Sequence, residues 1–587
     1  MQKRELIHPS RHIIVLGSFA IAVAGLVWRA VDLQVLNNSF LQDQGDARYL
    51  REVSIAAHRG MITDRNGEPL AVSTPVDSVW VNPKELVIDR DQWPLLAKLL
   101  KLDVDDLQRR ITKRANREFV YLKRRINPDV AQKVISMKIP GVSLQREYKR
   151  FYPAGEVAAH VVGFTNIDDA GQEGLELAYN DWLRGEPGKK RVIKDRLGHF
   201  VENVESISDP EPGKDLRLSL DKNLQYIAYR ELKLAVQQQN ARSGSIVVLD
   251  AMTGEVLAMA NQPSYNPNNR GMLKGSLYRN RAVTDVFEPG STVKPFTVAA
   301  ALDSGLFYTN SLIDTSPGYL RMGKYTIRDI HNYGNIDVST VIQKSSNVGA
   351  SKIALKMSSE QLWNMFSHLG FGAMSSSGFP GEVAGLLPGH WRWRDIDRVT
   401  MSYGYGLSVT PLQLAQAYTA IADNGRLKPV SFLADQSFDA VGDVMSAETS
   451  RQVLRMLEKV VLDGGTGTNA QVKGFRVAGK TGTVQKSTAG GYADDRFISV
   501  FAGVAPVTRP RFVMVVVINE PGNEDYFGGK VAAPVFSKVM ASALRLYGIT
   551  PDDVSNQQMK SAGLMAAKGS AFSDDVVTRV SHNGIGR

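Results

Sequence analysis

The 587-residue sequence contains no cysteine, which excludes several classes of site at once. Disulfides, thiolate metal centres, cysteine nucleophiles and lipid attachment through cysteine all require a thiol. The nine histidines are scattered, with no His-Glu-x-x-His or similar spacing, so we expect no metal and no cofactor. Basic runs interleaved with aromatic residues and nucleic-acid-binding motifs are also missing, so we expect no nucleic-acid partner.

One long uncharged run, Ile13 to Trp28, stands out near the N-terminus. It extends to residue 31 if Arg29 reaches the interface, and residues 13–31 are then long enough to cross a bilayer. Basic residues precede the run at Lys3, Arg4 and Arg11. The positive-inside rule therefore predicts a cytoplasmic segment 1–12, a transmembrane anchor 13–31 and an external remainder. A cleaved signal peptide is the alternative, but its small-x-small site (Ala22 to Ala24) lies inside the apolar run rather than after it.

The length predicts two to four domains. Lysine and arginine outnumber acidic residues, 70 against 60, and the net charge of +10 suits anionic surroundings such as lipid headgroups or an acidic polymer. A stretch rich in Pro, Ser, Gly and acidic residues predicts a linker at 206–215. We place one domain at 50–205, a second at 216–548 and a flexible tail at 549–587.

The second domain begins with helix and strand signals. A helix is expected to open at Asp221, and Ser245 to Asp250 with Glu255 to Ala260 forms a predicted hairpin. Strands are expected at 498–505 and 511–518, before a helix at 534–546 that has proline in its first turn. Short connections favour an antiparallel sheet, so the pattern predicts one large mixed α/β domain.

Three short motifs follow one another in that domain: Ser291-Thr-Val-Lys294, Ser345-Ser-Asn347 and Lys480-Thr-Gly-Thr483. Phe287-Glu-Pro-Gly290 precedes the first motif and an apolar helix follows it, which puts Ser291 at a helix N-terminus. Lys294 is three residues on and shares its face. A serine hydroxyl attacks only when a base takes its proton, and a lysine is that base only when burial or a second positive charge keeps it neutral. Lys480 is a candidate for that charge.

A lone Ser-x-x-Lys is weak, because ordinary composition gives on the order of two chance matches in such a chain. The ordered trio is specific, and it is known from penicillin-binding proteins and class A β-lactamases. The chain from Arg59 to Gly529 resembles the class B penicillin-binding proteins, closest to the division-specific penicillin-binding protein 3 type. The resemblance is carried by RGMITDRNGEPLAVSTPV, RFYPAGEVAAHVVGFTN, MANQPSYNPNN, DVFEPGSTVKPF, QKSSNVG, SYGYGLSVTPLQLA, KTGT and YFGG.

This resemblance implies a single transmembrane helix, an elongated α+β pedestal domain without a site, and a serine transpeptidase domain with a central antiparallel sheet flanked by helices. It implies a peptidoglycan D,D-transpeptidase in which Ser291 takes the acyl group from a D-Ala-D-Ala stem peptide and passes it to an acceptor amine of the septal wall. β-Lactams would acylate the same serine. The location would be the bacterial inner membrane, with the catalytic domain in the periplasm.

Roles also follow from the resemblance. Lys294 would be the acylation base, Ser345 the proton relay, and Asn347 would position Lys294 and the substrate amide. Lys480 would hold Ser345 in place. Substrate contacts would come from Thr481, Gly482, Thr483 and Tyr405, and the backbone N–H groups of Ser291 and Thr483 would form the oxyanion hole. Four further aromatic residues either wall the cleft or belong to the core: Tyr403, Phe497, Tyr526 and Phe527. An FtsW-type glycosyltransferase and other division proteins are the implied partners.

Two alternatives remain. The first is a hydrolase, either a DD-carboxypeptidase or a β-lactamase; Glu360 to Asn364 resembles the Glu-x-x-x-Asn spacing of a deacylating glutamate, but it follows Asn347 too closely and its segment is predicted to be helical. The second is a non-catalytic β-lactam-binding scaffold, against which the three intact motifs argue.

Overall fold

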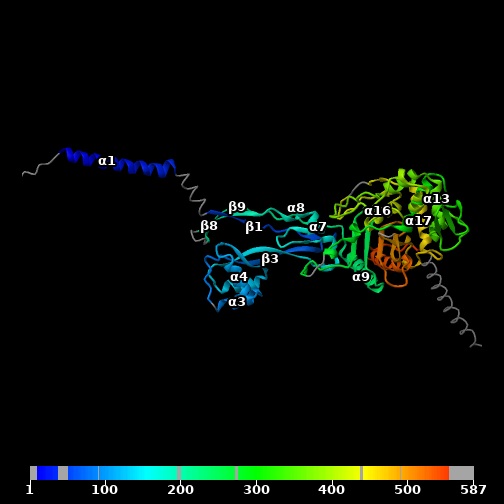
Figure 1. Ribbon diagram of the computed structural model, residues 1–587, viewed down its shortest axis with the longest axis horizontal. Helices are drawn as coiled ribbons and strands as arrows, with labels where there is room; N and C mark the ends of the chain where they lie inside the picture. Colours follow the sequence, from blue (N-terminus) through cyan, green and yellow to red (C-terminus); the bar gives the residue numbers. More distant parts are fainter. Residues whose placement is uncertain are drawn as a thin grey trace, which may run out of the picture. The chain divides into compact units, whose positions relative to one another are not determined.

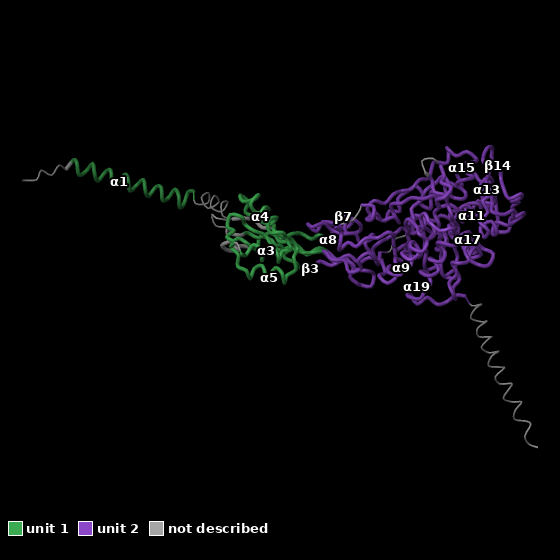
Figure 2. Tube along the Cα trace, turned by 60° about the horizontal axis from the view of Figure 1, so that its bottom comes forward, with its two compact units in different colours: residues 1–59, 74–149, 184–213 green, residues 60–73, 150–183, 214–587 purple. Residues whose placement is uncertain are grey.

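The protein is described here by a computed structural model, which covers residues 9–37, 50–89, 91–194, 200–271, 275–436, 440–488 and 491–553. Most of the predicted tail and residues 1–8 of the predicted cytoplasmic segment lie outside these residues. The chain forms two compact units, coloured separately in Figure 2. Unit 1 comprises residues 1–59, 74–149 and 184–213, and unit 2 comprises residues 60–73, 150–183 and 214–587.

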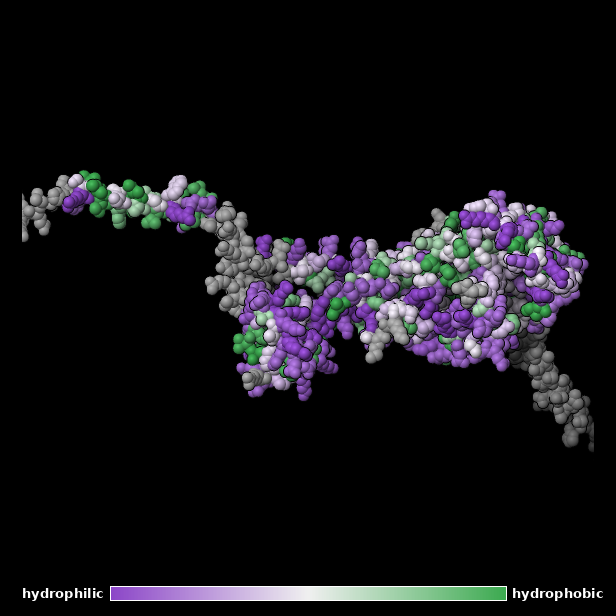
Figure 3. Space-filling view, in the orientation of Figure 1, coloured by the Kyte–Doolittle hydropathy of each residue, from purple (hydrophilic) through white to green (hydrophobic). Residues whose placement is uncertain are grey.

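Unit 1 begins with helix α1 (Pro9–Val31), which continues into a π-helical turn (Asp32–Leu36). The stretch Ser10–Leu36 is long and apolar enough to cross a membrane, and hydrophobic side chains cover much of α1 in Figure 3. None of it is buried against the rest of the protein. An apolar helix that finds no protein core is stable only in another apolar medium, which is consistent with membrane anchoring.

The rest of unit 1 is an α+β assembly. Its elements are β1 (Leu50–Ile55), β3 (Pro69–Val81), α3 (Gln92–Leu100), α4 (Val104–Thr112), β4 (Val120–Ile126), α5 (Pro128–Ser136), β5 (Val142–Phe151), β8 (Gly188–Lys194) and β9 (Phe200–Ser208). The three helices bury Leu96, Leu107 and Val134 against Val79 and Leu122 of the strands. β1, β8 and β9 form a separate antiparallel sheet. β9 ends at Ser208, so the predicted linker at 206–215 begins inside a strand.

Unit 2 is built on a five-stranded sheet whose strands are β11 (Ser243–Asp250), β12 (Val256–Gln262), β19 (Ala478–Thr488), β20 (Gly491–Ala505) and β21 (Phe512–Asn519). Their order is β12-β11-β21-β20-β19, and every neighbouring pair is antiparallel. The predicted antiparallel sheet is therefore confirmed. β19 lies at one edge, and this strand carries the Lys480-Thr-Gly-Thr483 motif.

Both faces of this sheet are buried, which explains the nearly continuous apolar sequence of β21. Side chains alternate along a strand, so Val513 and Val515 enter one core while Met514 and Val516 enter the other. Helices α11 (Lys294–Asp303), α16 (Pro411–Ala422) and α17 (Ala447–Val461) cover the first face, and α9 (Lys222–Gln238) and α19 (Ala533–Leu546) cover the second. Figure 1 labels α16 and α17 of the first layer and α9 of the second in separate parts of unit 2, and Figure 2 labels α9 and α19 of the second layer close together.

The remaining elements of unit 2 surround these layers. They are β2 (Ile62–Thr63), α6 (Ala159–Val162), β6 (Phe164–Thr165), β7 (Gly171–Glu173), α7 (Gly174–Ala178), α8 (Asn180–Arg184), β10 (Leu216–Arg217), α10 (Arg281–Thr284), β13 (Leu312–Asp314), β14 (Tyr319–Met322), β15 (Tyr325–Arg328), β16 (Asn335–Asp337), α12 (Val338–Lys344), α13 (Asn347–Lys356), α14 (Ser359–His368), α15 (Asp395–Ser402), β17 (Arg426–Leu427), β18 (Gly442–Asp443) and α18 (Gly528–Val531). Short 3₁₀ turns connect several of them.

Two segments that precede the predicted linker belong to unit 2, namely Gly60–Ser73 and Arg150–Leu183. Their side chains Ile62, Val161 and Leu175 are buried in the same core as the sheet. Arg150 and Glu176 form an ion pair of 2.7 Å inside this unit, with side chains 1% and 0% exposed. The first half of the chain therefore supplies part of the core of the second unit.

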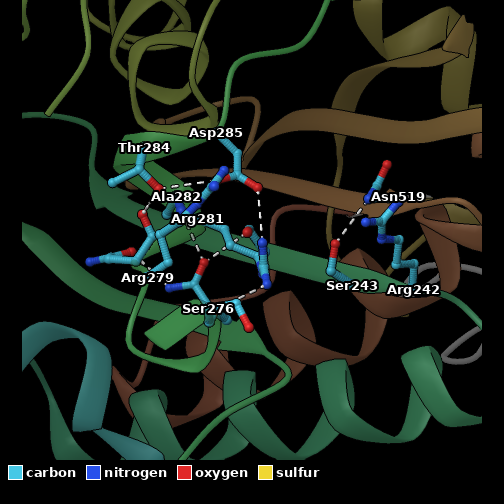
Figure 4. Close-up of polar contacts among 12 residues, drawn as sticks. Arg242, Ser243, Ser276, Arg279, Arg281, Ala282, Thr284, Asp285 and Asn519 are labelled. Carbon is cyan, nitrogen blue, oxygen red and sulfur yellow. Dashed lines mark hydrogen bonds and ion pairs between the residues drawn. The ribbon is translucent and has the colours of Figure 1, made fainter. Parts of the chain in front are cut away.

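A network of polar contacts orders the segment just before Ser291 (Figure 4). The Asp285 carboxylate accepts hydrogen bonds from Arg279 Nε (2.8 Å) and Arg281 Nη1 (3.1 Å), and the Ala282 N–H donates to Asn261 at the end of β12 (2.9 Å). At the same end of these strands, Asn519 donates to Ser243 (3.0 Å) and so ties β21 to β11. The segment that leads to Ser291 is thus fixed to the sheet.

The expected secondary structure of this unit is confirmed. Asp221 caps α9 by accepting from the N–H groups of Asn223 and Leu224, as Asp at an N-cap does. The hairpin β11–β12, the strands β20 and β21 and the helix α19 with proline in its first turn all occur close to their predicted positions.

Candidate active site

Ser291 lies in a short 3₁₀ turn, Gly290–Val293, which runs directly into α11. Residues three apart eclipse one another in a 3₁₀ turn, so this geometry sets Lys294 above Ser291. Pro295 occupies the first turn of α11, where its missing N–H costs nothing. Ser291 is partly exposed, and among the described residues its hydroxyl has no hydrogen-bond partner. The hydroxyl is therefore available to an incoming group.

Lys294 is completely buried and points at the second motif. Its Nζ donates to the backbone oxygen of Ser345 at 2.6 Å and to Oδ1 of Asn347 at 2.7 Å, and it lies 3.3 Å from Ser345 Oγ. A neutral amine has two N–H groups and one lone pair. The two close oxygens take both N–H groups, and the lone pair is left to accept a proton.

Lys480 approaches Ser345 from β19 and is also completely buried. Its Nζ donates to Ser345 Oγ at 2.9 Å and to the backbone oxygen of Thr481 at 3.1 Å. Burial lowers the pKa of Lys294 to about 7, although the carboxylate of Asp329 opposes this shift. Burial, and then repulsion by Lys294, lower the pKa of Lys480 as well. Two such ammonium groups cannot both keep their charge, so near neutral pH the pair includes an amine able to act as a base.

Asp329 holds the loop that presents Ser345, and sequence reasoning missed it. Its carboxylate accepts from Ser346 Oγ (2.5 Å) and from the N–H groups of Asn347 (2.5 Å) and Val348 (3.0 Å). These N–H groups are the unpaired donors at the start of α13, where a negative charge is favoured. No local pattern identifies Asp329, since it lies 17 residues before Ser346.

The two adjacent serines face different partners. Ser345 sits in the left-handed region (φ 59°) at the end of α12, which turns its hydroxyl toward the two lysines. Ser346 instead accepts from the N–H of Gly349 at 2.8 Å, as the N-cap of α13, while it donates to Asp329. Only Ser345 is in the position that a proton relay needs.

The Ser291 turn and the edge strand β19 touch directly. A side chain at Gly290 (φ +55°) would come within 2.4 Å of Val484, and one at Gly482 within 3.0 Å of Thr292. The Gly290 N–H donates to the oxygen of Gly404, where a side chain would come within 2.1 Å of the Gly290 oxygen. These close contacts therefore hold the turn that carries Ser291 against β19, the strand that carries Thr483.

A cleft of about 560 Å³ opens at this place. Ser291, Ser345, Asn347, Thr481 and Thr483 line it, together with Tyr405 and three of the aromatic residues whose role the sequence left open: Phe497, Tyr526 and Phe527. Phe497 stacks on Tyr526 with ring centroids 3.9 Å apart. The fourth aromatic residue, Tyr403, is not a lining residue and packs edge-on against Tyr405.

Other lining residues had been overlooked. Gly465 and Thr466 border the cleft as well, and Thr466 Oγ1 lies 2.8 Å from Thr481 Oγ1. Glu360 lies in α14, which agrees with the predicted helix, and it does not line the cleft. Within the described ranges, no three acidic or histidine side chains are grouped so that they could hold a metal ion.

Comparison with known proteins identifies the family. Residues 244–541 match the penicillin-binding protein transpeptidase domain, and residues 54–218 match the penicillin-binding protein dimerisation domain. The peptidoglycan D,D-transpeptidase FtsI of Escherichia coli K12 is 45% identical over 547 residues, which cover 92% of each chain.

Solved structures agree with this assignment. The apo transpeptidase domain of Burkholderia pseudomallei penicillin-binding protein 3 is 44% identical, covers 57% of this chain and 97% of its own, and has a TM-score of 0.53. Penicillin-binding protein 3 of Mycobacterium tuberculosis, solved with aztreonam, is 28% identical, covers 85% of this chain and 98% of its own, and has a TM-score of 0.67. The chain belongs to the family of penicillin-binding proteins with a transpeptidase domain.

Proposed function

We propose that this protein is a peptidoglycan D,D-transpeptidase in which Ser291 is the nucleophile. The observation that carries the proposal is the position of Ser345 Oγ, which lies 2.9 Å from Lys480 Nζ and 3.3 Å from Lys294 Nζ in the cleft that Ser291 also lines. Such a chain of groups can take a proton from a nucleophile and return it to a leaving group.

Acylation begins when Ser291 Oγ attacks the carbonyl carbon between the two D-alanines of a stem peptide. The hydroxyl proton passes to the lone pair of Lys294, and the carbonyl oxygen becomes an oxyanion. Backbone N–H groups of Ser291 and Thr483 stabilise this charge, and such preorganised donors contribute on the order of 3–4 kcal/mol each. The positive end of the Ser291 turn adds to the same effect.

The C–N bond then breaks, and the leaving amine of the last D-alanine receives a proton from Ser345 Oγ, which is replenished from Lys294. Lys480 holds Ser345 in position, and Asn347 holds Lys294. In the second half, the amine of a neighbouring stem peptide attacks the ester carbonyl, loses its proton to the same network, and frees Ser291. The hydroxyls of Thr481 and Thr483, which line the cleft, would bind the terminal carboxylate of the donor, and Gly482 between them would allow the close packing of β19 on the Ser291 turn. A β-lactam carboxylate would use the same contacts.

Helix α1 is consistent with a protein anchored in a membrane. We propose that its N-terminus is cytoplasmic and that unit 2 is periplasmic. We also propose one domain at 50–205 and a second at 216–548. The matches to the dimerisation domain at 54–218 and to the transpeptidase domain at 244–541 support a division into two such domains. An FtsW-type glycosyltransferase and other division proteins remain the proposed partners of the anchor and of unit 1, and septal wall the proposed product.

The test is covalent labelling followed by acyl transfer. A fluorescent penicillin should label the full chain, mass spectrometry should locate the adduct on Ser291, and Ser291→Ala should abolish it. Incubation with a D-Ala-D-Ala substrate and a D-amino acid acceptor should then yield the transfer product. Labelling that survives Ser291→Ala would show that the nucleophile is another residue, and release of free D-alanine without transfer would indicate a carboxypeptidase.

A further inference from the structure

The hairpin β14–β15 projects a cationic face close to the cleft. Its register pairs Tyr319 with Arg328 and Arg321 with Thr326, and these four side chains therefore share one face. The other face carries Ile327, which is buried. The hairpin is thus anchored on one side and exposes two arginines around a half-buried tyrosine on the other.

The two guanidinium groups surround a single ring. Arg321 lies over Tyr319 with its Cζ 5.4 Å from the ring centroid, and Arg328 lies over the same ring at 5.6 Å. A third cation, Lys324 at the tip, lies 5.3 Å from the ring of Tyr325. All three charged side chains are exposed, and across the part of the chain that the structure describes none of them forms an ion pair.

Like charges gathered without a counter-charge repel one another, and an aromatic ring offsets only part of that cost. The nearest carboxylate in the sequence, Asp329, is already occupied by Ser346 and the first N–H groups of α13. Two planar guanidinium groups can together bind a carboxylate through several hydrogen bonds. The hairpin therefore has the composition of an anion-binding surface.

This surface is continuous with the active site. The Arg328 backbone oxygen accepts from Asn347 Nδ2 at 3.1 Å, and the residues that follow β15, namely Asp329, Ile330 and Tyr333, line the cleft. A polymer held on the hairpin can therefore reach Ser291 with a neighbouring segment. The exposed Ile330 (75%) offers an apolar contact between the two places.

We propose that Arg321 and Arg328, with Lys324, form a subsite that binds a free carboxylate of a peptidoglycan stem peptide other than the carboxylate held by the threonines of β19. The proposal rests on the proposed transpeptidase function. The subsite selects a long, carboxylate-rich strand over a small molecule, because only a strand spans both the hairpin and the cleft. A β-lactam fills the cleft alone and gains nothing from it.

The experiment compares the full chain in detergent with Arg321→Gln/Arg328→Gln. Binding is measured by co-sedimentation with uncross-linked peptidoglycan strands, either native or with their carboxylates amidated by carbodiimide and ammonia. The variant should bind native strands about tenfold more weakly and amidated strands as weakly as the parent. Acylation by fluorescent penicillin should stay within twofold of the parent, which also reports that the variant is folded. Arg509→Gln/Arg545→Gln removes the same charge from the β20–β21 connection and α19, and should leave strand binding unchanged.

A charge-retaining pair, Arg321→Lys/Arg328→Lys, guards against a purely structural effect. It should bind native strands within threefold of the parent, and a loss as large as that of the glutamine pair would overturn charge recognition. Undiminished binding of native strands by the glutamine pair overturns the subsite, as does an equal loss on amidated strands. A loss confined to vesicles of anionic phospholipid would assign the cations to lipid instead. If the parent is not acylated by penicillin, the proposed function fails, whereas strand binding is read independently of it.

Discussion

Replacing each of the two adjacent serines of the second motif should give opposite results. Ser345→Ala removes the hydroxyl that lies between Lys294 and Lys480, so we expect a large loss of acylation with little loss of stability. Ser346→Ala removes the N-cap of α13 and a bond to Asp329, so we expect a loss of stability with most of the acylation rate retained.

The magnitudes follow from the contacts. A proton relay contributes about 10²- to 10⁴-fold to a rate, which is the expected loss for Ser345→Ala. For Ser346→Ala, a lost N-cap costs about 1 kcal/mol and a lost hydrogen bond to a charged group about 1.5–3 kcal/mol. The free energy of unfolding should therefore fall by about 2–4 kcal/mol, while the acylation rate falls less than tenfold.

The assay combines stopped-flow acylation by a fluorescent penicillin with denaturant unfolding followed by intrinsic fluorescence. Each variant is the matched control of the other, because the two substitutions delete the same hydroxyl one residue apart. A tenfold or smaller effect of Ser345→Ala on acylation, together with a 100-fold effect of Ser346→Ala, would show that the relay has been assigned to the wrong serine.

Further expectations concern the base, its support and the packing around it. Because burial lowers the pKa of Lys294 to about 7, its neutral fraction, and with it the acylation rate, should rise about tenfold between pH 6 and pH 8; a flat profile would contradict the base assignment. Asp329→Asn removes a charge that raises the pKa of Lys294, so the same rise should move to lower pH. Gly404→Ala places a methyl group about 2.1 Å from the Gly290 oxygen. If the backbone cannot move, penicillin labelling should fall at least 100-fold. Labelling equal to that of the parent would show that the backbone can move. Arg150→Ala removes the buried Arg150–Glu176 ion pair, so unfolding measurements should show a loss of about 3–5 kcal/mol.

Most secondary structure in unit 2 could be predicted because its signals are local. The cap at Asp221, the short apolar runs of β11 and β12, and the proline that opens α19 each depend on a few neighbouring residues. The division into units could not, because Arg150–Leu183 packs into a core formed by residues far along the chain. Composition predicts a boundary at one point along the sequence, whereas a hydrophobic core collects buried residues from separate parts of the chain.

The sequence by itself determined which residues are candidates for the chemistry: a serine and a lysine three apart, and two later motifs whose residue types suit acyl transfer. It also determined that an apolar helix precedes them, because the hydropathy of a segment can be calculated from its own residues alone. Only the tertiary structure decided which serine meets both lysines, that Asp329 anchors the loop, and that the residues just after β15 line the cleft. These contacts join residues 17 to 135 positions apart, and their distance, burial and charge exist only once the chain is folded.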